Sequence, residues 1–242
     1  MTDPLRFSAS SSFSSLGMML HHPRLLGSGA GGAVFAVSTS TDMDPKTTTT
    51  TTTSRMLAIK ISWLPSTESV ENECHILKHH ETFKVSGVEQ CLGIQCYDAD
   101  PRCVMILLEP VVEELTTVGS VDELGGMELQ MHAVESMMRI MVRMLAAREV
   151  VTDVQTLISR DTGNVLLTDF TEARILPQDE VITLLDEASL YNFLAELMEL
   201  IPESLLSIAS DAVVKEVTER EIKGGSVSNK VLVALKTHFN WE

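Results

Sequence analysis

Short apolar runs separated by glycine-rich and polar segments mark the first half of the chain. Residues 25–37 are apolar, then glycine-rich, then apolar again, and residues 57–61 form a second apolar run that contains one lysine. A third run, residues 103–108, is followed by Pro110, which cannot continue a ladder of backbone hydrogen bonds. Short apolar runs bounded in this way are typical of β-strands, so the pattern predicts at least three strands here.

Helical spacing dominates the second half. Apolar residues cover most of the circumference of residues 128–148, which predicts a helix buried on nearly all sides. Six methionines lie in or just before it, and we interpret them as soft core filling rather than as an adaptable binding surface. They are Met127, Met131, Met137, Met138, Met141 and Met144. Further helices are predicted at residues 67–80, 186–200, 203–220 and 228–238.

Two polar segments interrupt these elements. Residues 38–55 are rich in Ser, Thr and Asp and contain an unbroken run of seven threonines, a composition that cannot supply core and predicts a disordered insertion within a hairpin. Residues 161–164 carry turn-forming side chains between two apolar runs, which predicts a β-hairpin.

Composition limits the classes of function. The chain has 242 residues, is 44% hydrophobic and carries a net charge of −16, so it can bury a core but repels nucleic acid and anionic membrane surfaces. No apolar stretch is long enough to span a bilayer, and we expect a cytoplasmic protein. Organelle targeting by the Ser-rich first twenty residues stays open. The four cysteines lack a CxxC pair, which favours reduced, buried thiols over a zinc site.

The glycine-rich segment is the first candidate for chemistry. Gly27, Gly29 and Gly32 stand in the order G-x-G-x-x-G, and Val34 follows two residues later. In a dinucleotide-binding fold this spacing opens a helix, whereas here it lies between two predicted strands. The order strand, glycines, strand resembles the glycine loop of protein kinases. That resemblance implies that the backbone folds over the phosphates of ATP and that Val34 covers the base.

Further segments match the protein kinase superfamily in the same order along the chain. Ala58 and Lys60 resemble the V-A-I-K strand, whose lysine binds the α- and β-phosphates. Glu73, in a predicted helix, resembles the glutamate that pairs with that lysine. The resemblance therefore implies that Lys60 is a catalytic and nucleotide-binding residue and that Glu73 orients it.

Two more matches extend the resemblance to residues 25–175. Glu109 follows an apolar run as the segment between the two kinase lobes does, which implies that backbone groups near Glu109 and Val111 bind the adenine edge and that Leu108 closes the pocket. Asp169 and Phe170 resemble the D-F-G motif, which implies that Asp169 holds Mg²⁺ against the phosphates.

The resemblance implies an α+β, bilobal protein kinase-like fold. An antiparallel-sheet N-lobe would span about residues 21–110, including the insertion at 38–55, and a reduced helical C-lobe would span about residues 111–242. Residues 1–20 would then form a disordered tail. ATP and one Mg²⁺ ion are the ligands that this fold implies.

The catalytic loop departs from the family pattern. Asp153 matches the aspartate that accepts the proton of the substrate hydroxyl, but Thr152 replaces the preceding arginine and Ile158 stands where the metal-binding asparagine belongs. Thr171 also replaces the glycine of D-F-G. We therefore expect at most one well-held metal ion, at Asp169.

The region after Phe170 is shorter than in the family. Residues 186–197 resemble the buried helix that anchors the lower lobe, with Asp186 expected to hold the catalytic loop; residues 201–203 are an alternative, degraded match to the A-P-E motif. Under either alignment the peptide-docking platform is reduced. We expect an unknown protein partner to bind the exposed face near Glu219 and Glu221.

Three hypotheses about function follow. The first is a pseudokinase or weakly active kinase that binds ATP and acts as a regulatory module. The second is an active Ser/Thr protein kinase that transfers the γ-phosphate with the help of Asp153 and of Mg²⁺ bound by Asp169. The third is a scaffold that binds no nucleotide, and the presence of Lys60, Glu73 and Asp169 argues against it.

Overall fold

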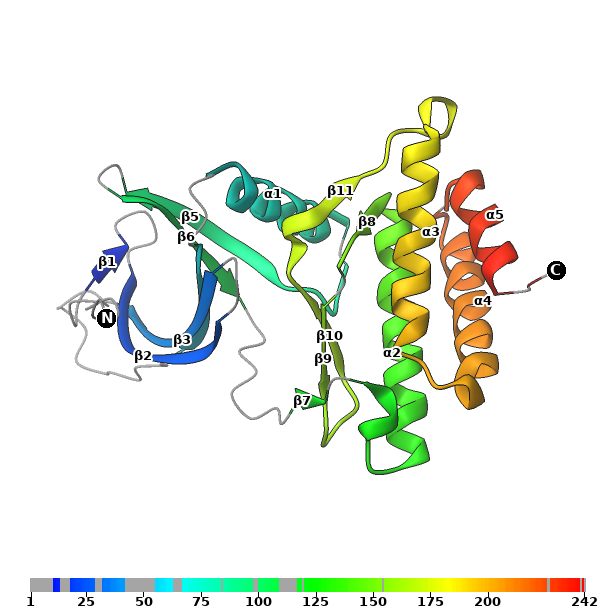
Figure 1. Cartoon of the computed structure of the whole chain (residues 1–242), viewed down its shortest axis with the longest axis horizontal. Helices are drawn as coiled ribbons and strands as arrows, with labels where there is room; N and C mark the ends of the chain where they lie inside the picture. Colours follow the sequence, from blue (N-terminus) through cyan, green and yellow to red (C-terminus); the bar gives the residue numbers. More distant parts are fainter. Residues whose placement is uncertain are drawn as a thin grey trace. The chain divides into compact units, whose positions relative to one another are not determined.

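The protein has a mixed α+β fold, seen in a computed structural model (Figure 1). The structure describes residues 11–13, 18–28, 32–41, 55–62, 67–83, 85–97, 100–108, 117–118, 120–153, 155–225, 227–239 and 241. The chain divides into two compact units, and each is described by itself. The first comprises residues 1–74 and 90–113, and the second comprises residues 75–89 and 114–242.

The first unit is built on an antiparallel sheet with the strand order β1-β2-β3-β4-β6-β5 (Figure 1). Its strands are β1 (Ser11–Phe13), β2 (Met18–Ser28), β3 (Gly32–Thr41), β4 (Arg55–Ser62), β5 (Gln90–Tyr97) and β6 (Asp100–Leu108). The strands predicted from the apolar runs are confirmed, but β5 was not predicted. A register shift between Cys91 and Gly93 interrupts the alternation that would have indicated it.

Two segments predicted to be disordered contain strand residues. The prediction of a tail over residues 1–20 is wrong for Ser11–Phe13 and Met18–Leu20, which lie in β1 and β2. The ends of the predicted insertion also belong to strands, since β3 extends to Thr41 and β4 begins at Arg55. Backbone ladder pairs form there without an apolar side-chain pattern, and threonine suits an extended backbone. The threonine run lies outside the described residues.

Helix α1 (Thr67–Phe83) confirms the first predicted helix and continues it by one turn. Its buried side chains recur at helical spacing, from Val70 through Glu73 and Cys74 to Leu77 and His80. The boundary between the two units falls between Cys74 and His75. One helix therefore supplies a buried carboxylate to the first unit and a buried histidine to the second.

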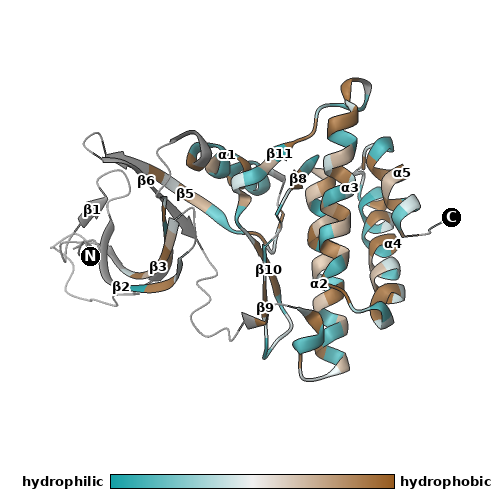
Figure 2. Ribbon diagram, in the orientation of Figure 1, coloured by the Kyte–Doolittle hydropathy of each residue, from teal (hydrophilic) through white to brown (hydrophobic). Residues whose placement is uncertain are grey.

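Four helices dominate the second unit (Figures 1 and 2). They are α2 (Met127–Ala146), α3 (Leu184–Glu199), α4 (Leu206–Ile222) and α5 (Asn229–His238), which confirms the predicted helices. Helix α2 packs on α4, and α3 packs on α5. Among the described residues, no helix combines the length and apolar character needed to cross a bilayer.

The methionines of α2 serve mainly as core, as the sequence predicts. Four of them are fully buried, which agrees with the hydrophobic colouring along much of this helix (Figure 2). They are Met137, Met138, Met141 and Met144. Met127 and Met131 are exposed, so the first turns of α2 differ from the prediction of burial on nearly all sides.

Short strands complete the second unit. They are β7 (Thr117–Val118), β8 (Glu149–Val151), β9 (Gln155–Ser159), β10 (Val165–Thr168) and β11 (Ala173–Ile175). The predicted hairpin is confirmed, because β9 and β10 pair antiparallel and the Ser159 N–H donates to the Asn164 carbonyl at 2.9 Å. Gly163 in this turn has φ +69°, and a Cβ there would collide with the Leu129 carbonyl oxygen. Short 3₁₀ helices lie at Val121–Glu123, Phe170–Glu172, Asp179–Val181 and Glu203–Leu205.

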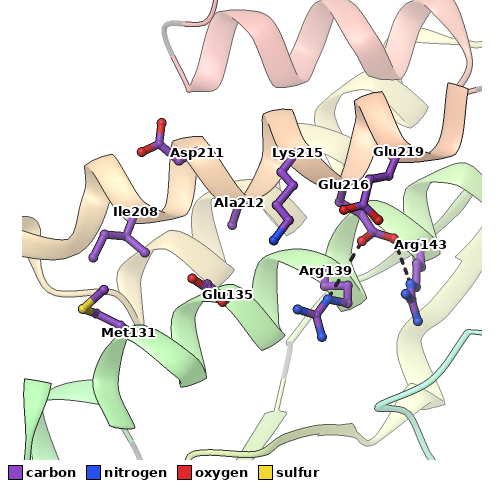
Figure 3. Close-up of a pocket in the computed structure, with 10 residues that line it drawn as sticks. All are labelled: Met131, Glu135, Arg139, Arg143, Ile208, Asp211, Ala212, Lys215, Glu216 and Glu219. Atoms are coloured by element: carbon purple, nitrogen blue, oxygen red, sulfur yellow. Dashed lines mark hydrogen bonds and ion pairs between the residues drawn. The ribbon is translucent and has the colours of Figure 1, made fainter. Parts of the chain in front are cut away.

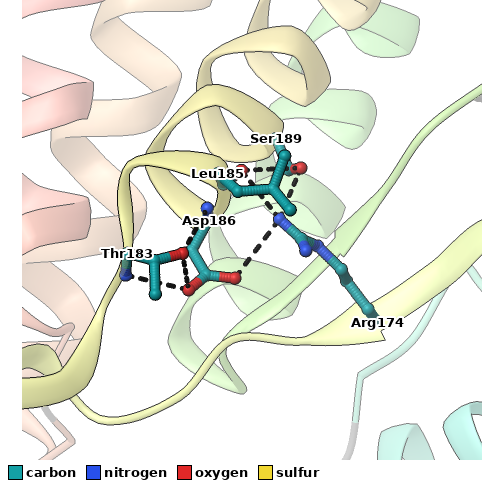
Figure 4. A network of polar contacts seen from close by, with 5 residues as sticks. All are labelled: Arg174, Thr183, Leu185, Asp186 and Ser189. Carbon is teal, nitrogen blue, oxygen red and sulfur yellow. Dashed lines mark hydrogen bonds and ion pairs between the residues drawn. The ribbon is translucent and has the colours of Figure 1, made fainter.

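The first turn of α3 is fixed by a reciprocal cap (Figure 4). The Thr183 hydroxyl oxygen accepts a hydrogen bond from the Asp186 N–H at 3.3 Å, and the Thr183 N–H donates to Asp186 Oδ2 at 2.9 Å. Arg174 Nη2 lies 3.3 Å from Asp186 Oδ1. Asp186 was expected to hold the catalytic loop, but its contacts among the described residues are with Thr183 and Arg174, so that expectation is wrong.

Replacing the cap residue should weaken the start of α3. We expect Thr183→Ala to lower the free energy of unfolding by about 1 kcal/mol, because the Asp186 N–H loses its acceptor. The backbone hydrogen bond from Thr183 holds the pKa of Asp186 below its ordinary value of 3.8. The stability that Asp186 contributes is therefore fully present above pH 3.8 and is lost as the pH falls further. Urea unfolding between pH 7 and pH 3 checks both effects, and a Thr183→Ser variant should retain the wild-type stability.

Candidate functional site

Lys60 and Glu73 form a salt bridge in the first unit. Lys60 is the third residue from the end of β4, and Glu73 lies on the buried face of α1. Lys60 Nζ donates to both carboxylate oxygens of Glu73 at 2.9 Å. The Lys60 side chain is 16% exposed and the Glu73 side chain is 1% exposed. The predicted pairing is therefore confirmed, and it removes a carboxylate from water almost completely.

The glycine-rich hairpin is adjacent to this pair in the sheet. Gly27 is opposite Val34 in the β2–β3 ladder, and Val34 is opposite Lys60 in the β3–β4 ladder. A Cβ at Gly32 would collide with the Ile61 carbonyl oxygen, so this position requires glycine. Strand β3, and no helix, follows the glycines, which confirms the prediction against a dinucleotide-binding turn. Gly29 lies outside the described residues.

The remaining predicted base-binding residues are described only in part. Ala58 is half-buried in β4, where it is opposite Ala36 and Leu107. Leu108 is the last residue of β6. Glu109 and Val111 lie outside the described residues, so their expected contacts with an adenine edge stay predictions.

In the second unit, Asp169 directly precedes the 3₁₀ helix at Phe170–Glu172. Its backbone is left-handed, with φ 62° and ψ 71°. The Thr171 hydroxyl donates to Asp169 Oδ1 at 2.6 Å. Phe170 is buried, and its ring meets the ring of His80 edge to face at a centroid distance of 4.8 Å. Thr171 therefore gives the Asp169 carboxylate a hydroxyl partner.

Asp153 is exposed in the loop that follows β8, and it also has a left-handed backbone with φ 61°. The loop lies beside the Asp169 segment, because β8 pairs with β11 and the Thr152 hydroxyl donates to the Glu172 carbonyl at 3.4 Å. Among the described non-glycine residues, positive φ occurs only at Arg148, Asp153 and Asp169. Strained backbone of this kind is concentrated at functional sites.

Ile158 stands at the position expected for a second metal ligand. It is completely buried in β9, opposite Val165 of β10. Its surroundings are those of a core side chain, and neither its chemistry nor its position suits a metal. Within the part of the chain that the structure describes, no group of three or more His, Cys, Asp or Glu side chains could hold a metal ion by itself.

A buried histidine and glutamate cluster was missed by the sequence analysis. The carboxylate of Glu149, the first residue of β8, contacts His79 Nδ1 and His80 Nε2 of α1. Glu149 and His80 are both completely buried. His80 also packs on Phe170, so the cluster connects α1, β8 and the segment that carries Asp169. No local pattern indicates it, since the partners lie about 70 positions apart in the chain.

Two cysteines were predicted wrongly. Cys74 of α1 and Cys91 of β5 form a disulfide with a Cα–Cα distance of 5.2 Å. The expectation of reduced thiols is therefore wrong for this pair, although both side chains are buried as expected. A separation of 17 residues between a helix and a strand has no motif signature, so only tertiary structure reveals the pairing.

A groove of about 450 Å³ runs along the surface where α2 packs on α4 (Figure 3). Arg143 donates through Nε to Glu216 Oε1 at 2.9 Å and through Nη1 to Ser86 Oγ at 2.6 Å. Arg139 Nε lies 3.9 Å from the other oxygen of Glu216. Glu219, near which a partner was expected to bind, also lines the groove.

No protein-family model matches this chain, and comparison with curated proteins gives no match.

Proposed function

We propose that the protein is a protein kinase-like ATP-binding module, a pseudokinase or weakly active kinase with a regulatory role. The observation that carries this proposal is the Lys60–Glu73 pair beside the glycine-rich hairpin. The α+β fold, with an antiparallel sheet in one unit and helices in the other, supports a bilobal kinase-like arrangement.

The burial of Glu73 favours a functional role for the pair over a purely structural one, because a buried ion pair adds little net stability. Taking two charges out of water costs several kcal/mol per ion, and apolar side chains of similar volume are often equally stable or more so. Glu73 lies at a position of α1 where the neighbouring buried positions, Val70 and Leu77, are apolar. A lysine held by a carboxylate, beside a hairpin that is open at Gly27, is suited to bind phosphate oxygens.

Asp169 is the residue that would hold magnesium. Mg²⁺ is commonly bound by one or two carboxylates together with substrate phosphates and water, so a single aspartate is a sufficient protein ligand. When bound, the ion neutralises charge on the β- and γ-phosphates. Thr171 donates a hydrogen bond to one oxygen of the Asp169 carboxylate, which would restrict the orientation of the carboxylate toward a bound ion.

The buried Ile158 favours the pseudokinase over a fully active enzyme. Phosphoryl transfer depends on positioning and on charge neutralisation, and the loss of one metal ligand is expected to reduce the rate about 10²-fold or more. The exposed carboxylate of Asp153 supports weak Ser/Thr kinase activity as the second candidate. Transfer of labelled γ-phosphate to protein that is abolished in Asp153→Asn would select that candidate; equal labelling of both proteins would reject it.

Thermal unfolding with and without ATP tests nucleotide binding. At a ligand concentration of 100 times Kd, binding stabilises the folded protein by about 2.7 kcal/mol, which raises Tm by about 5–10 °C for a protein of this size. We expect this shift with Mg²⁺, a much smaller shift with EDTA, and loss of the difference in Asp169→Asn. Asp161→Asn, in the exposed turn of the β9–β10 hairpin, is the matched control and should behave as wild type. No shift at millimolar ATP would support the nucleotide-free scaffold instead.

The proposal also includes a cellular location and a surface for a partner protein. We propose a cytoplasmic regulatory module that binds a partner protein through the face near Glu219 and Glu221. Both side chains are at the end of α4, and Glu221 is exposed. Lysine substitutions at both positions should reduce partner recovery; unchanged recovery would place the partner elsewhere.

A further inference from the structure

The disulfide between Cys74 and Cys91 joins α1 to β5 at the residue that directly follows Glu73. The Cα–Cα distance of 5.2 Å lies within the usual range for disulfides, so the bridge requires no displacement of the backbone. Cys74 and Cys91 are 2% and 7% exposed. The bridge is thus a covalent tether inside the first unit, and it is attached to the residue next to Glu73, whose buried carboxylate pairs with Lys60.

The position of α1 relative to the sheet sets the contact between Lys60 and Glu73. Lys60 belongs to β4 and Glu73 to α1, so their 2.9 Å contacts require that helix and sheet keep a fixed separation. Strand β5 pairs with β6, and β6 pairs with β4. The disulfide therefore connects the helix that carries Glu73 to the same hydrogen-bonded sheet that carries Lys60.

We propose that Cys74 and Cys91 are positioning residues for the Lys60–Glu73 pair and that reduction of their disulfide weakens nucleotide binding. This inference rests on the proposed ATP-binding function. A dithiol reductant supplies two electrons and two protons: the S–S bond breaks, two thiols form, and the two thiols of the reductant become a disulfide. In a reducing compartment, disulfides are commonly transient and serve as redox sensors.

Reduction proceeds by thiol–disulfide exchange. An attacking thiolate forms a mixed disulfide with one of the two buried sulfurs, here Cys91 Sγ. Cys74 then leaves as the thiolate within α1. The helix segment around Glu73 loses its covalent connection to β5 and is then held by non-covalent contacts, among them the Lys60–Glu73 pair and the burial of Val70.

The test compares oxidised and reduced protein in two measurements. The first is the affinity for a fluorescent ATP analogue with Mg²⁺, and the second is the hydrogen exchange rate of amides 70–77 without nucleotide. Coupling between sites typically changes affinity by about 5- to 150-fold, and we expect reduction to weaken binding by about tenfold and to accelerate exchange in α1. Reoxidation should restore both. Intact mass and thiol labelling establish the redox state.

Three variants make the test specific. Cys91→Ser should behave as the reduced protein in both redox states, and the double variant Cys96→Ser/Cys103→Ser should respond to reductant as wild type does. In a Glu73→Gln background, reduction should leave the affinity unchanged, because the tether acts through Glu73. If the disulfide had a merely structural role, its reduction would weaken nucleotide binding equally with and without Glu73.

Two results would overturn the inference. One is equal affinity and equal α1 exchange for the oxidised and reduced proteins, and the other is a reductant response that persists in Cys91→Ser. If no form of the protein binds the analogue, the proposed function fails. Exchange in α1 then still decides whether the disulfide holds the helix that carries Glu73.

Discussion

Lys60→Met should lower the free energy of unfolding by about 3 kcal/mol, in addition to its effect on nucleotide binding. The Glu73 carboxylate is 1% exposed and accepts two hydrogen bonds from Lys60 at 2.9 Å. Methionine matches the length of the lysine stem but cannot compensate the buried negative charge. Removing one partner of a buried pair costs more than the pair itself contributes, because the other charge stays out of water.

A double-mutant cycle measures this effect by urea unfolding. Lys60→Met/Glu73→Leu should recover most of the loss, since an apolar pair carries no buried charge. Lys78→Met is the matched control, because Lys78 is exposed on the same helix as Glu73 and its replacement should change stability by less than about 0.5 kcal/mol. A loss below about 1 kcal/mol for Lys60→Met would show that the pair is effectively solvated.

Glu149→Ala should cost about 3 kcal/mol of stability. Glu149 is completely buried and contacts ring nitrogens of both His79 and His80. Its removal leaves the buried His80 Nε2 without this carboxylate and opens a cavity at the start of β8. Among the described residues, His80 Nδ1 has no hydrogen-bond partner, and His80 Nε2 lies against the Glu149 carboxylate.

Glu149→Ala should also impair the proposed magnesium site, because the histidine and glutamate cluster packs on the segments that carry Asp169 and Asp153. His80 packs on Phe170, next to Asp169, and β8 leads into the loop of Asp153. We therefore expect Glu149→Ala to reduce the magnesium-dependent part of the ATP thermal shift as well as Tm. Glu221→Ala, at an exposed position of α4, is the control and should change neither. A Glu149→Ala protein as stable as this control would contradict the role of the cluster.

Those parts of the fold with a strong local pattern were predictable from sequence. The apolar circumference of α2 and the turn residues of the β9–β10 hairpin gave the correct elements, with boundaries shifted by one or two residues. The sequence pattern did not predict strands that are held by backbone hydrogen bonds to a neighbouring strand and lack an alternating apolar pattern. Strand β5 contains a bulge beside Gly93, and Ser11–Phe13 pair with β2 despite a polar composition.

The candidate site was predictable only where a motif carries it. The order of Lys60 and Glu73 along the chain indicated their pairing, and the structure confirms it. The cluster at Glu149 and the Cys74–Cys91 disulfide each join residues that are adjacent only after folding. Asp186 illustrates the opposite error: a motif suggested a contact with the catalytic loop, whereas a local capping interaction satisfies its carboxylate.

Calorimetric titration of the oxidised protein with ATP tests the central claim most directly. The account predicts saturable binding of one ATP per chain in the presence of Mg²⁺, at least tenfold weaker in Lys60→Met, and unchanged in Lys78→Met. Comparison at a temperature where all variants remain folded separates affinity from stability. Two results would contradict a nucleotide site at the Lys60–Glu73 pair. One is the absence of binding heat at millimolar ATP over a range of temperatures, and the other is equal affinity for wild type and Lys60→Met.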